Sequence, residues 1–152
     1  MRRSLVITML NRRVFLLSTL AIPVSVSAHA HSYTVGAIAI GHVWSLPSET
    51  SETQVFAPFV NRGNAADELV AARSSICSMI ELRQNNRYDD PPLKSIELQP
   101  GKPLAMRKGA RHLRLIGLTK SLKAGDRFDM ILDFLNAGEV TVEVMVEDGP
   151  GH

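Results

Sequence analysis

Two runs near the end of the chain alternate between apolar and polar residues, and this alternation limits what the chain can fold into. The runs cover residues 127–134 and 139–146, and each places an apolar side chain at every second position. Successive side chains of a β-strand point to opposite faces, so a period of two indicates a strand with one face buried. The glycine-containing segment NAGE lies between the runs. We therefore expect two antiparallel strands joined by a tight turn.

The rest of the chain repeats this organisation in shorter pieces. Apolar or alternating runs occur at residues 32–40, 53–60, 68–73, 76–82, 95–98 and 112–118. The segments between them are rich in Gly, Pro, Asn and Asp, which are turn-forming residues. Short strands at this spacing are typical of a β-sandwich. The sequence predicts one all-β domain, an antiparallel β-sandwich over residues 31–148, with a short tail at 149–152.

Residues 1–30 differ in character from the rest of the chain. They contain four arginines and no acidic residue, followed by an apolar stretch and small residues. This order is typical of a signal peptide, and the pair Arg12-Arg13 resembles a twin-arginine export signal. Cleavage is expected after Ala28 or Ala30, and the alternative is an uncleaved N-terminal anchor. We expect an exported, periplasmic protein with no membrane span after signal cleavage.

Removing this leader reverses the sign of the net charge. The whole chain has 17 basic and 15 acidic residues, and all the acidic residues lie outside the leader. The remainder holds 13 basic and 15 acidic residues, a net charge of −2. A slightly acidic domain is a poor partner for nucleic acid, so we expect none. The single cysteine, Cys77, lies in an apolar run and is expected to be a buried small hydrophobe.

A series of local segments, taken in order along the chain, carries a family resemblance. The segments are Val43-Trp44, NRGNAADELVAA, IEL, SIELQPGK, HLRLIGLTKSLKAGDRFDMILDF and AGEVTVEV. Together they resemble the periplasmic copper chaperones of the PCu(A)C type, and residues 112–134 are the most specific part of the match. The resemblance implies a cupredoxin-like sandwich that carries Cu(I) to a periplasmic or membrane-bound copper-accepting protein. Trp44 is expected to belong to its core.

The resemblance also implies a copper site, of which this chain keeps one ligand. The family binds Cu(I) through a His, a Met and a His-x-Met pair, a set of soft donors that suits this ion. His112 matches the His of the pair, but Arg114 stands at its Met. Arg83 stands at the first His and Asp90 at the first Met. Two arginines bring positive charge to a cation site, so we expect a degenerate metal site.

Three arrangements of these residues remain open at this point. In one, Arg83 and Arg114 flank Asp90 in an ion-paired network that needs no metal. In another, the two arginines form an anion site with His112, joined by Lys108 or Arg111. In the third, His112 still binds a metal, together with the thioether of a shifted methionine. The candidates for that thioether are Met79 and Met106.

A second copper site is expected at the N-terminus of the mature chain. Cleavage after Ala28 would leave His29-Ala30-His31 at the start. The free amine, two amides and the third-position imidazole then offer the square-planar nitrogen set that Cu(II) prefers. Cleavage after Ala30 would leave His31 first, and its amine and ring can also chelate copper.

The sequence therefore predicts an exported copper-chaperone-like binding protein with a degenerate metal site. The alternative is a non-metal interaction module that binds an acidic protein partner or an anion through a basic face. The basic residues support that alternative, since eight of the 13 outside the leader fall within residues 102–127. We do not expect an enzyme, because the sequence contains no Ser-His-Asp order, no HExxH motif and no glycine-rich phosphate loop.

Overall fold

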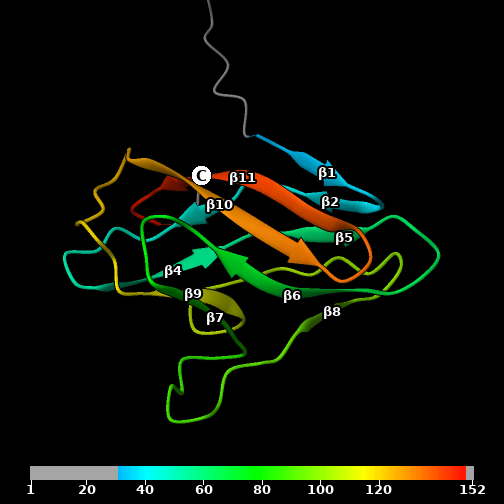
Figure 1. The fold of residues 1–152 in the computed structure, drawn as a ribbon, viewed down its shortest axis with the longest axis horizontal. Helices are drawn as coiled ribbons and strands as arrows, with labels where there is room; N and C mark the ends of the chain where they lie inside the picture. Colours follow the sequence, from blue (N-terminus) through cyan, green and yellow to red (C-terminus); the bar gives the residue numbers. More distant parts are fainter. Residues whose placement is uncertain (1–30, 150–152) are drawn as a thin grey trace, which may run out of the picture.

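Eleven β-strands make up the regular structure of residues 31–149, the part of the chain that the computed structural model describes (Figure 1). In chain order they are β1 (Tyr33–Val35), β2 (Ile38–Ile40), β3 (Trp44–Ser45), β4 (Glu52–Phe56), β5 (Phe59–Asn61), β6 (Asp67–Arg73), β7 (Met79–Arg83), β8 (Ile96–Leu98), β9 (His112–Ile116), β10 (Arg127–Phe134) and β11 (Gly138–Val146). No helix occurs among these residues, so they contain no helix that could cross a membrane.

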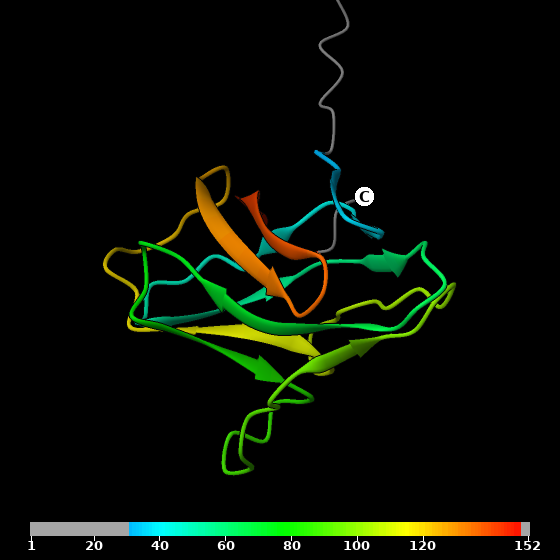
Figure 2. The ribbon, with the colours of Figure 1, turned by 45° about the vertical axis from the view of Figure 1, so that its right-hand side comes forward.

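The strands form two sheets around one core. The smaller sheet has the order β1-β2-β5, and the larger one has the order β7-β9-β4-β3-β11-β10-β6-β8. The larger sheet curls, with β10 and β11 on one side of the molecule and β7 and β9 on the other (Figures 1 and 2). Strands β6 and β7 lie near opposite ends of this larger sheet but contact each other, so the curled sheet encloses the core. The predicted all-β, cupredoxin-like antiparallel sandwich is confirmed, with one parallel pair between β11 and β3.

The alternating runs at the end of the chain form the hairpin that they predict. Strands β10 and β11 pair antiparallel, with Phe128 opposite Val144 and Met130 opposite Val142. All four of these side chains are buried. The turn needs a residue with positive φ, and Gly138 supplies it at +89°. The alternation therefore fixes which face of this hairpin points into the core.

The segment NRGNAAD, residues 61–67, includes a loop that two buried polar side chains hold in place. The amide of Asn61 donates hydrogen bonds to the carbonyl oxygens of Ala65 and Leu98, at 2.8 and 2.9 Å. The carboxylate of Asp67, which is also buried, accepts hydrogen bonds from backbone N–H groups, including those of Asn136 and Ala137 at 2.9 Å. Buried polar groups need such partners, so both side chains join this loop to the neighbouring turn.

Two sequence expectations about individual side chains have different outcomes. Trp44 is half-buried and packs against the core, with its ring centroid 4.5 Å from that of Phe56. Cys77 was expected inside a buried strand, and this is wrong: it lies in a bend before β7 and is only half-buried. Partial burial raises the pKa of its thiol, which reduces the thiolate available near neutral pH.

Candidate functional site

Three of the four predicted family ligand positions, Arg83, His112 and Arg114, lie on the outer face of β7 and β9. In the antiparallel pairing of these strands, Arg83 lies directly opposite His112, and Glu81 lies opposite Arg114. The intervening residue Leu113 is fully buried in the core, so its neighbours point the other way. The spacing His-x-Arg therefore places both side chains on one face, as the alternation predicts.

Both ring nitrogens of His112 already have hydrogen-bond partners. The imidazole is fully buried, and its Nδ1 lies 2.7 Å from the carbonyl oxygen of Ala110. A carbonyl oxygen only accepts, so Nδ1 carries the proton and Nε2 keeps a lone pair. The hydroxyl of Tyr88 lies 3.0 Å from Nε2 and donates to it. The lone pair that would bind a metal is therefore engaged by Tyr88.

The surroundings of His112 keep its imidazole neutral. Burial lowers the pKa of His112, and the charges of Arg83 and Arg114 lower it further. The hydrogen bond to Ala110 opposes this shift but does not reverse it. In a neutral imidazole with a protonated Nδ1, the atom Nε2 can accept a hydrogen bond from the hydroxyl of Tyr88.

Tyr88 is the central residue of the site, and sequence reasoning placed it only in a turn. Its ring centroid lies 3.8 Å from Cζ of Arg114 and 5.0 Å from Cζ of Arg83, both within cation–π range. Its hydroxyl also accepts a 2.9 Å hydrogen bond from the side-chain amide of Gln54. The signal in the sequence was a lone aromatic residue within a polar segment between two predicted ligand positions.

Arg114 is held by two carboxylates. Its Nε and Nη2 donate to the carboxylate of Glu52 on β4, at 3.0 and 2.8 Å, and its Nη1 donates to Glu81 at 3.3 Å. Burial alone would lower the pKa of Arg114, but these two carboxylates outweigh it and raise the pKa. The guanidinium is therefore a permanent cation in a fixed position where the resemblance implies a copper-binding thioether.

Arg83 is buried and binds the loop that carries Tyr88. Its Nη2 donates to the backbone carbonyls of Arg87 and Asp90, at 2.9 and 3.0 Å, and its Nη1 lies 3.5 Å from the carboxylate of Glu81. The carboxylate of Asp90 pairs instead with Arg87 at 3.4 Å. An arginine–carboxylate network does fill the site. The expectation that Asp90 supplies its carboxylate is wrong, because Glu52 and Glu81 supply theirs.

The structure does not favour the anion site that the sequence left open. The charges of Arg83 and Arg114 face the carboxylates of Glu52 and Glu81, so the cluster has no surplus positive charge. Arg111 points its Nε to the side-chain oxygen of Gln84, at 3.3 Å. An added anion would have to displace a carboxylate to find a free guanidinium.

The shifted-methionine arrangement is not favoured either. Met79 pairs with Ile116 at the far end of β7, four residues from Arg83, which is about 13 Å along the strand. Met106 is buried in the core. Between residues 31 and 149 no three side chains of His, Cys, Asp or Glu gather as metal ligands.

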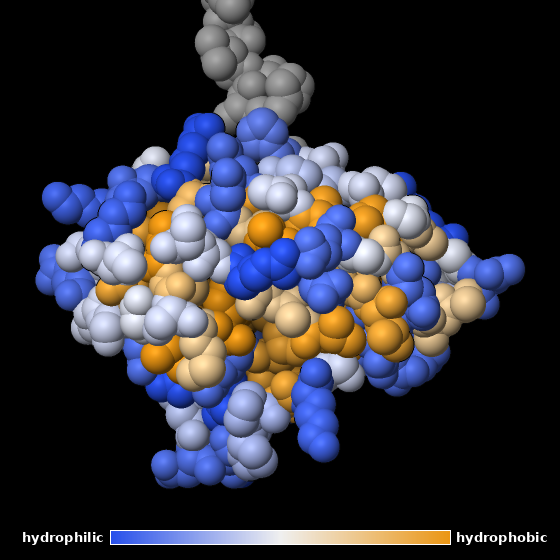
Figure 3. All heavy atoms as spheres, viewed as in Figure 1, coloured by the Kyte–Doolittle hydropathy of each residue, from blue (hydrophilic) through white to orange (hydrophobic). Residues whose placement is uncertain are grey.

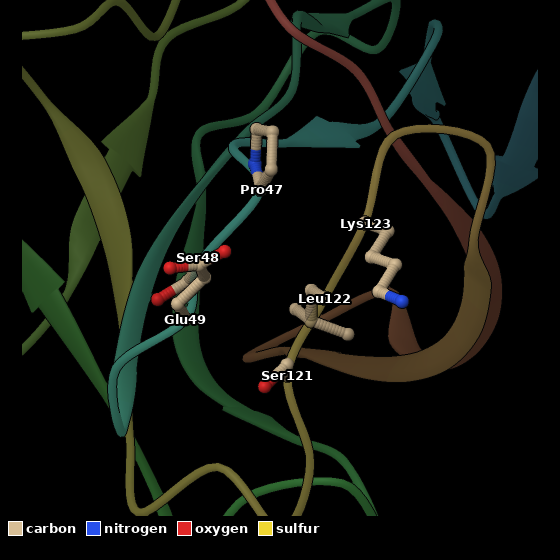
Figure 4. A pocket seen from close by; sticks show the side chains of 6 residues that line it. All are labelled: Pro47, Ser48, Glu49, Ser121, Leu122 and Lys123. Carbon is tan, nitrogen blue, oxygen red and sulfur yellow. The ribbon is translucent and has the colours of Figure 1, made fainter.

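One open hollow lies beside the site, and a second one shares Pro47 with it. The smaller, of about 220 Å³, is lined by Tyr88 and Arg114 together with Leu46, Pro47, Glu52, Thr53 and Gln54. The larger, of about 490 Å³, lies between residues 47–49 and residues 121–123 (Figure 4). It contains one acidic and one basic side chain, Glu49 and Lys123, and none of the predicted site residues.

The expected N-terminal site is described only in part. His29 lies outside the described residues. His31 is exposed, and its Nε2 lies 3.6 Å from the carboxylate of Glu143 on β11. His42 has a separate partner, because its Nε2 lies 2.5 Å from the carboxylate of Glu147. His29 and His31 as copper ligands therefore stay a prediction.

Comparison with known proteins finds a family model and a relative that each match most of the chain. A family model described as putative lipoprotein LpqE-like matches residues 38–146. A putative lipoprotein of Leifsonia xyli subsp. xyli is 25% identical over 136 residues, which is 86% of this chain and 82% of that protein.

Solved structures of similar proteins have the same fold as this chain. The copper-bound PCuAC domain from PmoF2 is 30% identical, with a TM-score of 0.70, over 79% of this chain and 99% of that domain. The apo PCuAC domain from PmoF1 is 24% identical, with a TM-score of 0.71, over 79% of this chain and 100% of that domain. The Cu(I) form of DR1885 from Deinococcus radiodurans is 20% identical, with a TM-score of 0.55, over 80% and 83%, and shows the fold alone.

Proposed function

Because the chain belongs to the LpqE-like family and to the PCuAC-type domains, we propose that it is an exported copper-chaperone-like binding protein whose family metal position no longer holds copper. The relative from PmoF2 is a copper-bound domain, and this chain covers almost all of it. The lipoprotein description of the family supports export. The proposal involves no catalytic step.

One observation supports the proposal that the copper site of the family is lost. The hydroxyl of Tyr88 donates to Nε2 of His112, the atom through which that imidazole would bind a metal. The guanidinium groups of Arg83 and Arg114 lie 5.0 and 3.8 Å from the centroid of the Tyr88 ring. A Cu(I) ion at this place would have to break the hydrogen bond, and neither guanidinium group can serve as its ligand. The copper role of the protein therefore needs other ligands.

We assign that role to the N-terminus of the mature chain. His31 lies on the surface beside Glu143 rather than in the core, so it is accessible to an ion. A free amine together with His29 or His31 offers nitrogen ligands that Cu(II) prefers. The partner would be a periplasmic or membrane-bound copper-accepting protein. The alternative, a basic face for an acidic partner, gains no support at the site because its charges are paired.

A copper titration of the exported protein tests this assignment. Cu(II) is expected to bind with a stoichiometry of about one per chain and to show the visible absorption of a square-planar nitrogen site. Mass spectrometry of the same sample identifies the first residue. Acetylation of the N-terminus is expected to abolish binding, and the change His31→Ala is expected to remove the absorption of the square-planar site.

The change His42→Ala is the matched control, because His42 is paired with Glu147 and plays no part in the N-terminal site. It should leave the titration unchanged. Copper binding that persists after acetylation and in the His31→Ala protein would refute the N-terminal assignment.

A further inference from the structure

The first described residues of the chain lie on the surface beside β11. Strand β1 contacts β11 (Figure 1), and the surface around the start of β1 is hydrophilic (Figure 3). His31 and Tyr33 are two residues apart there, and their ring centroids are separated by 6.5 Å. Both side chains contact the same residue of β11, which is Glu143.

Glu143 holds this part of the chain through two of its groups. Its backbone N–H donates a 2.9 Å hydrogen bond to the hydroxyl of Tyr33. Its carboxylate oxygen Oε1 lies 3.6 Å from Nε2 of His31 and also accepts a 3.3 Å hydrogen bond from Arg127. The bond to Tyr33 ties the start of β1 to β11. The carboxylate is thereby aimed at one particular nitrogen of His31.

That nitrogen, Nε2, is the one that an N-terminal copper site leaves unused. A histidine that binds copper through its own backbone nitrogen can close the chelate ring only with Nδ1, because Nε2 lies on the far side of the imidazole. This holds whether the mature chain begins at His29 or at His31. In both cases Nε2 carries the proton and points to the carboxylate of Glu143. Histidines that bind a metal usually donate their second ring N–H to such an acceptor.

We propose that Glu143 is a positioning residue for the N-terminal copper site, an inference that rests on the proposed function. Its carboxylate accepts the Nε2–H of copper-bound His31, which orients the imidazole and makes Nδ1 a stronger donor. Glu143 acts through His31 and does not bind the ion itself. In the copper-free protein the contact is an exposed pair, which contributes little to folding. Its effect is therefore expected on copper binding rather than on stability.

The Cu(II) affinity of the exported Glu143→Ala protein tests this role. Loss of such a carboxylate weakens metal binding about 10–100-fold, so the dissociation constant should rise at least about tenfold in competition with a Cu(II) chelator. Glu139→Ala is the matched control. Glu139 also lies on β11 and pairs with an arginine, Arg73 at 2.8 Å, and its loss removes the same charge. It is four residues from Glu143, about 13 Å along the strand, where salt screens its charge, so the affinity should stay within about twofold of wild type.

Pulsed EPR of the Cu(II)-loaded proteins separates the hydrogen bond from simple charge attraction. The quadrupole coupling of Nε2, the ring nitrogen remote from the ion, responds to the hydrogen bond that its N–H donates. This coupling is expected to differ between wild type and Glu143→Ala and to be equal in wild type and Glu139→Ala. Both glutamates lie at the surface, with side chains 32% and 52% exposed, so both variants should fold, which circular dichroism checks.

The outcomes distinguish this inference from the proposed function. Wild-type affinity in Glu143→Ala, or an unchanged Nε2 coupling, overturns the role of Glu143 and leaves the N-terminal copper site in place. Equal weakening by Glu139→Ala also overturns it, because general charge would then explain the loss. Copper binding that acetylation of the N-terminus does not weaken refutes the N-terminal site, and the role of Glu143 with it.

Discussion

Restoring the ligand types that the family resemblance implies is expected to create a Cu(I) site on the outer face of β7 and β9. The variant Arg83→His/Tyr88→Ala/Asp90→Met/Arg114→Met keeps His112 and adds one imidazole and two thioethers around it. It also removes both guanidinium charges and frees Nε2 of His112. Soft donors in this set suit Cu(I), so uptake should rise from none to about one ion per chain.

Competition against a chromogenic Cu(I) chelator measures this gain. The background should carry His29→Ala and His31→Ala, so that only the sheet face can bind. Adding His112→Ala to the restored variant is the control and should abolish uptake. A restored variant that folds but leaves all copper with the chelator would show that the four positions do not form the family site.

Removing Arg114 alone is expected to destabilise the protein strongly. The change Arg114→Ala should lower the free energy of unfolding by about 2–4 kcal/mol, because it leaves two carboxylates without their shared cation. Glu81, of whose side chain only 17% is exposed, would keep only the longer contact with Arg83 at 3.5 Å, whereas Glu52 is 39% exposed and can turn toward water. Tyr88 loses its nearest cation as well. Urea unfolding measures the change.

Arg127→Ala is the matched control for this effect. Arg127 also bonds a glutamate, Glu143 at 3.3 Å, but 56% of its side chain is exposed. Surface ion pairs contribute little, so this change should cost less than about 1 kcal/mol. Similar costs for the two substitutions would mean that the Arg114 network adds no more than an ordinary surface pair.

The sequence was sufficient for the fold and for part of the site because both depend on local alternation. A period of two in β10 and β11 fixes which side chains point inward, and the same period in β9 places His112 and Arg114 on one outer face. The resemblance to PCu(A)C proteins then pointed to Arg83, which the structure places directly opposite His112.

The remaining site residues could not be predicted because they depend on pairing between distant segments. Glu52 reaches Arg114 only through the register of β4 against β9, and Glu81 only through the register of β7 against β9. No local pattern specifies these registers. Tyr88 and Asp90 depend on the course of an irregular loop, which is why the expected Asp90 carboxylate proved to be a backbone carbonyl contact instead.

We propose that Tyr88 and the arginine network close the family metal position of this chain. This claim is tested most directly by Cu(I) competition on wild-type mature protein whose N-terminal histidines are replaced by alanine. We predict that the protein removes no Cu(I) from a chromogenic chelator and that His112→Ala changes nothing. Uptake of one Cu(I) per chain that His112→Ala abolishes would contradict the claim.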